Sequence, residues 1–228
     1  MSVLSFIVES LICSGLFLVL YRWMLAKKVS FRLCRVYLIV TMVLSVTIPV
    51  MEVPLYPSEK VAGLTEWTVF SFDDFGVTSS DIIEGDTAVT SVDASIRSFH
   101  LKHILTIISS LVGLVSLALL AYNTIKIYRL RSRSKLTCNE DYTLAEHEDI
   151  KTPFSFIRTI FMGFNYEPQE RRQILTHEAS HVRHRHSYER LFMSVLRSIF
   201  WFNPFFWMAE KDLEEVQEWE ADMHISHK

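Results

Sequence analysis

The stretch His177-Glu178-Ala179-Ser180-His181 carries the strongest chemical signal in this chain of 228 residues. It reads H-E-x-x-H within a run of helix-forming residues. Residues four apart lie on one face of a helix, so both imidazoles can reach one metal ion. Glu178, beside the first imidazole, can accept a proton from water that the metal activates. The pattern therefore predicts a Zn²⁺ site with His177 and His181 as ligands and Glu178 as the general base.

A third ligand is expected in the acidic segment that follows. Glu218-Trp219-Glu220-Ala221-Asp222 reads E-x-x-A-D, and the small Ala221 permits close packing of this helix on the H-E-x-x-H helix. Glu218 is the predicted ligand, and Asp222, one turn beyond it, can accept the free ring N–H of a ligand histidine. Glu214 and Glu215 are alternative ligands. Most other acids of the segment are expected to form a solvated face.

The composition points to a membrane protein. Half of the residues are hydrophobic and the mean hydropathy is +0.21, which is too apolar for an ordinary soluble domain unless the apolar residues are clustered. Three clusters, Val3–Leu25, Val36–Met51 and Ile104–Tyr122, approach the about 20 residues that a membrane-spanning helix needs. No basic residue precedes the first cluster, so we expect an anchor and not a cleaved signal peptide. A net charge of −3 gives no reason to expect direct nucleic-acid binding.

The predicted fold is mainly α: a polytopic membrane protein with three N-terminal transmembrane helices and a cytosolic, membrane-apposed helical domain. The predicted parts are two transmembrane helices within 1–53, an acidic extracytoplasmic loop at 54–102, a third transmembrane helix at 103–125 and the metal-binding domain at 126–228. We expect the loop to be a partly ordered connector with one short strand near Glu66–Phe72.

The charges orient the three spans. The connection Tyr21–Arg35 and the segment 126–135 carry basic residues and no acids, whereas 54–102 has eight acidic against three basic residues. Cytoplasmic loops are enriched in Lys and Arg, so the N-terminus is expected outside and everything after Lys126 in the cytosol. The basic run after the third span could also bind anionic lipid, although a stop-transfer flank explains it more simply.

The segment Leu191–Ala209 is hydrophobic enough to be a fourth span. We expect one helix from about Gln169 to His186 before it, and Glu218 after it must share a metal with that helix. Both ends must then lie on the same side of the membrane, so we predict a membrane-apposed or re-entrant helix pair broken at Asn203-Pro204. Arg197 within the segment also disfavours a simple span. The alternative is a true fourth span with Glu218 not a ligand.

Two further features of the sequence have an interpretation from the residue pattern alone. Pro153 with Phe154 and Phe156 suggests an edge strand or an extended segment, which could pair with an extended substrate or simply pack in the core. His184 and His186 are expected to lie on a solvated face or against lipid headgroups, without a role in the metal site.

Together these residues resemble a known family. H-E-A-S-H, Asn203-Pro204 within an aromatic run, E-W-E-A-D and the three preceding spans look like the BlaR/MecR-type membrane zinc metallopeptidases, and the segments 152–156, 186–187 and 201–204 are similar to its Bacteroidetes-like branch. The resemblance covers essentially the whole chain.

The resemblance implies a gluzincin domain on the cytosolic face of a bacterial inner membrane, with Zn²⁺ held by His177, His181 and Glu218. It implies antibiotic-sensor-like signalling by regulated proteolysis, with a transcriptional repressor or the enzyme itself as the protein substrate, and a homodimer is compatible with it. Family members usually continue into another span and an extracytoplasmic domain, whereas this sequence ends at Lys228, so we expect a form truncated relative to the family.

Two other classes of function stay open at this point. A catalytically inactive zinc-binding signalling scaffold would have no need of Glu178. A small transporter or channel subunit would need polar residues in its spans, and the second and third spans have few beyond Ser and Thr. The metallopeptidase is the function that we expect.

Overall fold

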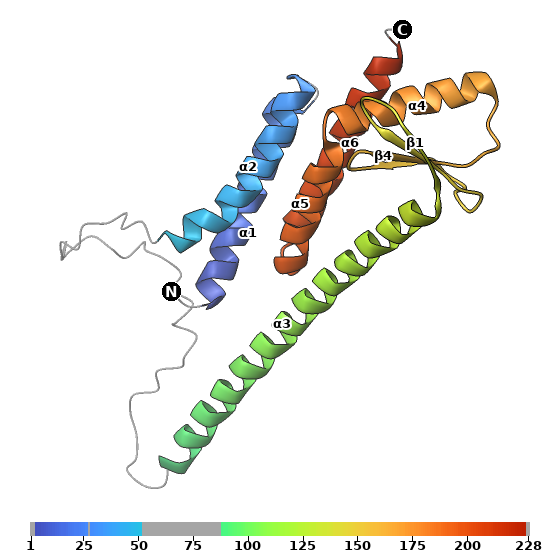
Figure 1. Cartoon of the computed structure of the whole chain (residues 1–228). Coiled ribbons are helices and arrows are strands. Elements are labelled where there is room, and N and C mark those ends of the chain that lie inside the picture. Colours follow the sequence, from blue (N-terminus) through green and yellow to red (C-terminus); the bar gives the residue numbers. More distant parts are fainter. Residues whose placement is uncertain (1–2, 27, 52–87, 227–228) are drawn as a thin grey trace. The chain divides into compact units, whose positions relative to one another are not determined.

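The computed structural model describes residues 3–26, 28–51 and 88–226 of the chain. This part is mainly helical, as predicted, with a small sheet before the last three helices (Figure 1). In chain order the elements are α1 (Val3–Leu20) with the π-helical turn η1 (Tyr21–Leu25), α2 (Phe31–Val50), α3 (Ala88–Arg133), β1 (Lys135–Cys138), β2 (Thr143–Glu146), β3 (Phe154–Phe156), β4 (Thr159–Met162), α4 (Pro168–Arg183), α5 (His186–Ile199) and α6 (Pro204–Ser226).

Three stretches of helix are long and apolar enough to cross a membrane. They are Ser5–Leu25, Phe31–Val50 and Thr106–Arg133, which overlap the three predicted spans. Large aliphatic side chains such as Ile12 and Leu114 are exposed on them, as lipid-facing positions require. The third stretch ends later than the predicted Tyr122. The predicted strand in the acidic loop lies outside the described residues.

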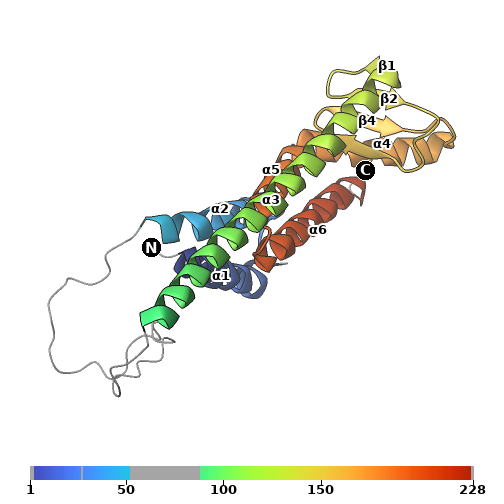
Figure 2. The ribbon, with the colours of Figure 1, turned by 90° about the horizontal axis from the view of Figure 1, so that it is seen from below.

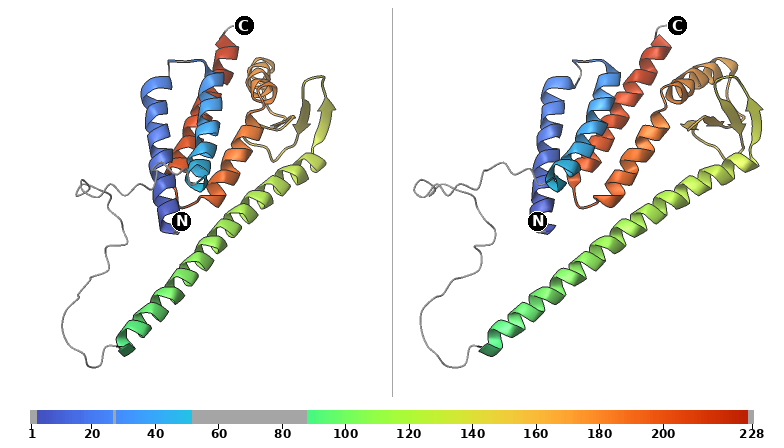
Figure 3. Two further views of the ribbon diagram at one scale, coloured as in Figure 1. Left: turned by 90° about the vertical axis from the view of Figure 1, so that its left-hand side faces the viewer. Right: turned by 60° about the vertical axis from the view of Figure 1, so that its left-hand side comes forward.

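The hairpin of α5 and α6 packs against the first two helices, which lie side by side (Figure 3). Their shared core includes Leu38 and Met42 of α2 and Phe206 and Leu213 of α6, all fully buried. α1 presents a small residue to this hairpin, because a Cβ on Gly15 would lie only 2.9 Å from the end of the Phe205 ring. Small residues of this kind allow helices to approach closely within a membrane.

The hydrophobic segment Leu191–Ala209 is broken, as predicted. α5 ends at Ile199 and α6 begins at Pro204, a favoured residue for the first turn of a helix because its missing N–H would have no partner there. Within the hairpin, Arg197 forms an ion pair of 2.8 Å with Glu210 and lies 4.4 Å from the centroid of the Trp207 ring. The charge that argued against a simple span is therefore compensated inside the hairpin.

The predicted helix Gln169–His186 is wrong at its C-terminal end. α4 ends at Arg183, and Arg185 adopts a left-handed conformation with φ 60° and ψ 31°. The N–H groups of His184 and Arg185 donate to the carbonyls of Ser180 and Val182, which satisfies the last turn in the manner of a left-handed C-terminal cap. The chain changes direction at this cap, so that His186 starts α5.

The sheet has the strand order β1-β2-β4-β3, with β2 and β4 parallel and the other pairs antiparallel. β3 is therefore an edge strand, as Pro153 and its neighbours predicted, and the Phe154 ring also stacks on Phe161 at 4.7 Å. The sequence indicated only this one strand of the four.

The two faces of the sheet contact different helices. Val182 and Ile174 of α4 pack on Ile160 and Met162, and the views of Figures 1 and 2 both show α4 beside the sheet. Ile127 of α3 packs on the other face. The sheet thereby supports α4, the helix that carries the H-E-x-x-H residues.

Candidate metal centre

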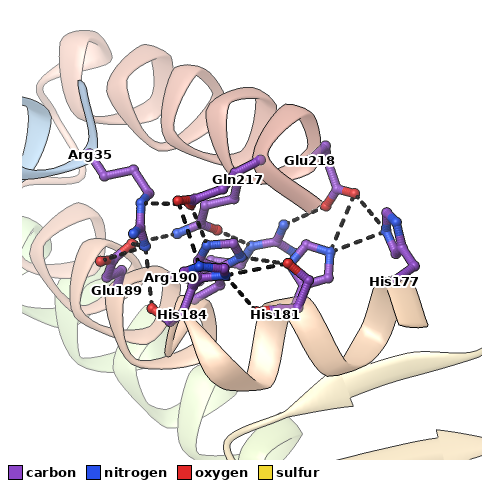
Figure 4. A network of polar contacts seen from close by, with 11 residues as sticks. Arg35, His177, His181, His184, Glu189, Arg190, Gln217 and Glu218 are labelled. Atoms are coloured by element: carbon purple, nitrogen blue, oxygen red, sulfur yellow. Dashed lines mark hydrogen bonds and ion pairs between the residues drawn. The ribbon is translucent and has the colours of Figure 1, made fainter. Parts of the chain in front are cut away.

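The three predicted ligands lie together at the contact of α4 with α6. The Nε2 atoms of His177 and His181 are 3.2 Å apart, as their spacing on one helix face predicts. Glu218 Oε2, from α6, lies 3.4 Å from His177 Nε2 and 3.6 Å from His181 Nε2. Figure 4 shows all three side chains pointing to one point in space. The α5–α6 hairpin is what returns Glu218 to the H-E-x-x-H helix.

These distances fit a zinc ion. Zn²⁺ binds four ligands tetrahedrally with bonds of about 2.1 Å to nitrogen or oxygen, which places the ligand atoms about 3.4 Å from one another. The three separations of 3.2, 3.4 and 3.6 Å lie around that value. Two imidazoles and one carboxylate are also the donor set of a zinc site that keeps its fourth position for water or substrate.

The electrostatics of the centre favour an ionised carboxylate. Hydrogen bonding to His177 and then to His181 holds the pKa of Glu218 well below its usual range, although burial acts against this. The same contact with Glu218 raises the pKa of His177 above its usual value, helped by the nearby charge of Glu178. The second oxygen of Glu218 accepts a hydrogen bond of 2.6 Å from Arg190. Glu218 therefore offers Oε2 to a metal while Arg190 holds Oε1.

Asp222 lies where the sequence placed it relative to a histidine. Its Oδ1 is 3.2 Å from Nδ1 of His177. Because a metal would be bound through Nε2, the proton of a neutral His177 ring would sit on Nδ1, where Asp222 can accept it. The alternative ligands Glu214 and Glu215 are exposed and do not belong to the clusters of metal-binding groups in the described part of the chain.

Glu178 is half-buried on α4, adjacent in sequence to His177. Within the described residues its carboxylate makes no hydrogen bond or ion pair. A carboxylate without such partners can change its protonation without breaking a structural contact, which suits a group that must accept and release protons.

Two residues of the centre were missed by sequence reasoning. The prediction that His186 lies on a solvated face is wrong: it is 1% exposed, and its Nδ1 lies 2.7 Å from Nδ1 of His181. Its Nε2 lies 3.0 Å from Glu220, an acid that was also expected to be solvated. Burial lowers the pKa of His186 to about 4, so this ring is neutral at pH 7. His184, beside it, is half-buried.

No periodicity in the sequence could have revealed His186. It follows His181 by five residues, which on a continuous helix would carry it away from the metal-binding face. The left-handed Arg185 ends α4 first, and the change of direction brings the two rings together.

The chain matches a known protein family over nearly its whole length. The model of the BlaR1 peptidase M56 family matches residues 2–227, and the chain therefore belongs to that family. None of the curated proteins compared with the chain matches it. Membership and the three apolar helices make this a membrane protein of a peptidase family. The Bacteroidetes-like branch stays a prediction.

Proposed function

We propose that the chain is an integral-membrane zinc metalloendopeptidase that acts in regulated proteolysis. The observation that carries the proposal is the cluster of His177, His181 and Glu218, whose separations suit zinc. Beside it lies the carboxylate of Glu178, which makes no hydrogen bond or ion pair with the part of the chain that the structure describes. Membership of the BlaR1 peptidase M56 family supports the same chemistry.

Each residue of the centre has its own role in peptide hydrolysis. His177, His181 and Glu218 would hold a zinc ion, which would supply Lewis acidity and lower the pKa of water towards neutrality. Glu178 accepts the proton of the attacking water and passes it to the leaving amine. Asp222 keeps the ring proton of His177 on Nδ1 and so leaves Nε2 free.

The position of the centre supports a cytosolic active site. Arg35, at the start of α2, contacts Glu220 near the centre, and it ends the basic connection that begins at Tyr21. Basic connections face the cytosol, so we place the centre on that side, with the N-terminus outside and the protein in a bacterial inner membrane.

The substrate would be a protein, either a transcriptional repressor or the enzyme itself. β3 is an edge strand and α4 packs against it. An extended peptide can add to such an edge through main-chain hydrogen bonds, which would bring it alongside the H-E-x-x-H helix.

The test is the zinc content of the detergent-purified protein, for the wild type and Glu218→Ala, with Glu214→Ala as the matched control on the same helix. We expect about one zinc per chain in the wild type and in the control and a sharp reduction in Glu218→Ala. Absence of zinc from the wild type would overturn the proposal. Zinc retained in Glu218→Ala and lost in Glu214→Ala would identify Glu214 as the third ligand.

A zinc-loaded wild type must also cleave a protein. Zinc binding without hydrolysis of candidate repressors or of the chain itself would leave the inactive signalling scaffold as the function. Intact Glu178 argues for the enzyme, because a scaffold gains nothing from a general base at that position.

A further inference from the structure

One buried cation of a membrane-spanning helix lies beside the groups that surround the metal centre. Arg35 belongs to α2, is 5% exposed, and contacts acids from two other helices. Its Nη1 donates to both oxygens of Glu189 on α5 at 3.0 Å, and its Nε lies 3.1 Å from Glu220 Oε2 on α6. Among the described residues this Nε–H has no well-aligned hydrogen bond, so Arg35 acts on Glu220 through its charge.

One chain of contacts runs from Arg35 to His181. Glu220, paired with Arg35, is an ionised acceptor, so His186 must carry its proton on Nε2, 3.0 Å away. The Nδ1 atoms of His186 and His181 are 2.7 Å apart, so they share a single proton. When Nε2 of His181 binds a metal, this proton sits on Nδ1 of His181 and is donated to Nδ1 of His186, which fixes the orientation of the His181 ring.

A second chain of contacts runs from Arg35 to Glu218. Glu189, held by Arg35, accepts a hydrogen bond of 2.8 Å from Gln217. Arg190 donates to Gln217 at 2.7 Å and to Glu218 Oε1 at 2.6 Å. Each of these hydrogen bonds can run in one direction only, because arginine only donates and an ionised carboxylate only accepts. Figure 4 shows this path across the labelled residues.

Both chains of contacts depend on the positive charge of Arg35. Glu220 is largely buried and Glu189 half-buried. Removing the guanidinium would leave both carboxylates without the cation that they share, which is costly for charged groups shielded from water. One carboxylate would then turn away, which would free the ring of His186 or the amide of Gln217.

The same cluster does not favour a second metal ion. His184, His186 and Glu220 offer three donor atoms within 4.8 Å of one another. However, Nδ1 of His186 is engaged by His181, and the guanidinium of Arg35 already lies against Glu220. A further cation would be repelled there, so the geometry favours a hydrogen-bonding role for these groups.

We propose that Arg35 is a positioning residue that holds two metal ligands in place, His181 through Glu220 and His186, and Glu218 through Glu189, Gln217 and Arg190. The proposal rests on the zinc centre of the proposed function. It assigns a residue of a membrane-spanning helix to the orientation of the metal ligands. Partners that orient metal ligands typically change metal affinity about 10- to 100-fold when they are removed.

The test compares Arg35→Met with Arg22→Met in the detergent-purified full chain. Arg22 also joins the N-terminal helices to α6, through two hydrogen bonds of 2.9 Å to Asp212, but it is connected to neither chain of contacts. We measure the dissociation constant of Zn²⁺ by competition with a chelator. We also record the visible absorption of the Co²⁺-loaded protein, which reports the geometry of the ligands.

We expect Arg35→Met to weaken zinc binding by about tenfold or more and to alter the Co²⁺ spectrum. The dissociation constant of Zn²⁺ for Arg22→Met should stay within about twofold of the wild type, and its Co²⁺ spectrum should be unchanged. Arg35→Lys retains the charge and should recover part of the affinity. Glu220→Gln removes the anion while keeping the size of the side chain, and it decides the question if Arg35→Met does not fold.

Zinc binding by Arg35→Met or by Glu220→Gln that equals the wild type would overturn the proposal, as would equal losses in Arg35→Met and Arg22→Met. A second zinc per chain that disappears in His184→Ala would also overturn it, because the cluster would then be a metal site. A wild type that binds no zinc would instead refute the zinc centre itself, which separates the two failures.

Discussion

Asn203 Nδ2 donates a hydrogen bond of 2.9 Å to Ser14 Oγ, although the two residues are 189 positions apart in the chain. Both residues are fully buried. Ser14 lies near the middle of the candidate span Ser5–Leu25, so the tip of the α5–α6 hairpin reaches the depth of the middle of that span. This supports a re-entrant hairpin at the break that the sequence predicted.

Replacing Asn203 with Ala should destabilise the protein by about 2 kcal/mol. The change removes the cap of α6, because Asn203 Oδ1 accepts the N–H of Phe205 at 3.0 Å, and loss of such a cap costs about 1 kcal/mol. It also leaves Ser14 without this buried donor, which costs about 1 kcal/mol more. Unfolding in detergent, followed by circular dichroism, measures the loss. Asn165→Ala, at an exposed position, is the control and should change stability by less than about 0.5 kcal/mol; equal effects of the two variants would contradict the assigned role.

Replacing Glu178 with Gln should leave zinc binding intact and reduce cleavage by about 10²- to 10⁴-fold, the usual contribution of a general base. Gln has the size of Glu but cannot accept the proton of water. Zinc content and cleavage of a protein substrate are measured on the same preparation. Cleavage at the wild-type rate by a purified Glu178→Gln variant would show that another group is the base.

Replacing Asp222 with Ala should weaken zinc binding, because Nδ1 of His177 loses its acceptor. Asp222 is 67% exposed in its side chain, so water can take its place in part and we expect a loss of only about tenfold, the lower end of the usual range. Chelator competition measures it, with Glu215→Ala as the control from the same helix. A loss in Glu215→Ala and none in Asp222→Ala would exclude Asp222 and point to Glu215.

Replacing Arg185 with Gly should stabilise the protein by about 1 kcal/mol, because a left-handed residue other than Gly is strained by about 1–2 kcal/mol. Arg185 is exposed, so little packing is lost. Arg183→Gly is the matched control: it lies inside the last turn of α4 and should destabilise by about 1 kcal/mol. Thermal unfolding of both variants measures the effects, and stabilisation by neither or by both would refute the left-handed cap.

Part of the centre could be predicted from local spacing. His177 and His181 share a helix face because they are four residues apart, and this relation requires only that the segment be helical. The break at Asn203-Pro204 is also local, since proline cannot continue the preceding helix. The return of Glu218 to His177 could be predicted from topology, because a metal cannot be shared across a bilayer.

The sequence alone determined that three apolar segments form helices, that H-E-x-x-H presents two imidazoles and one carboxylate, and that the segment before Glu218 turns back. Each of these follows from the period of a helix, from hydropathy or from the properties of proline. Only the tertiary structure decided that His186 contacts the ring of His181. The same is true of the ion pairs that Arg35 makes with Glu220 and Glu189. Those contacts join residues from separate helices, and their geometry depends on one left-handed residue and on how α2, α5 and α6 pack together. The composition of a segment describes its average environment, whereas the burial of a single polar group is set by the neighbours that the fold brings to it.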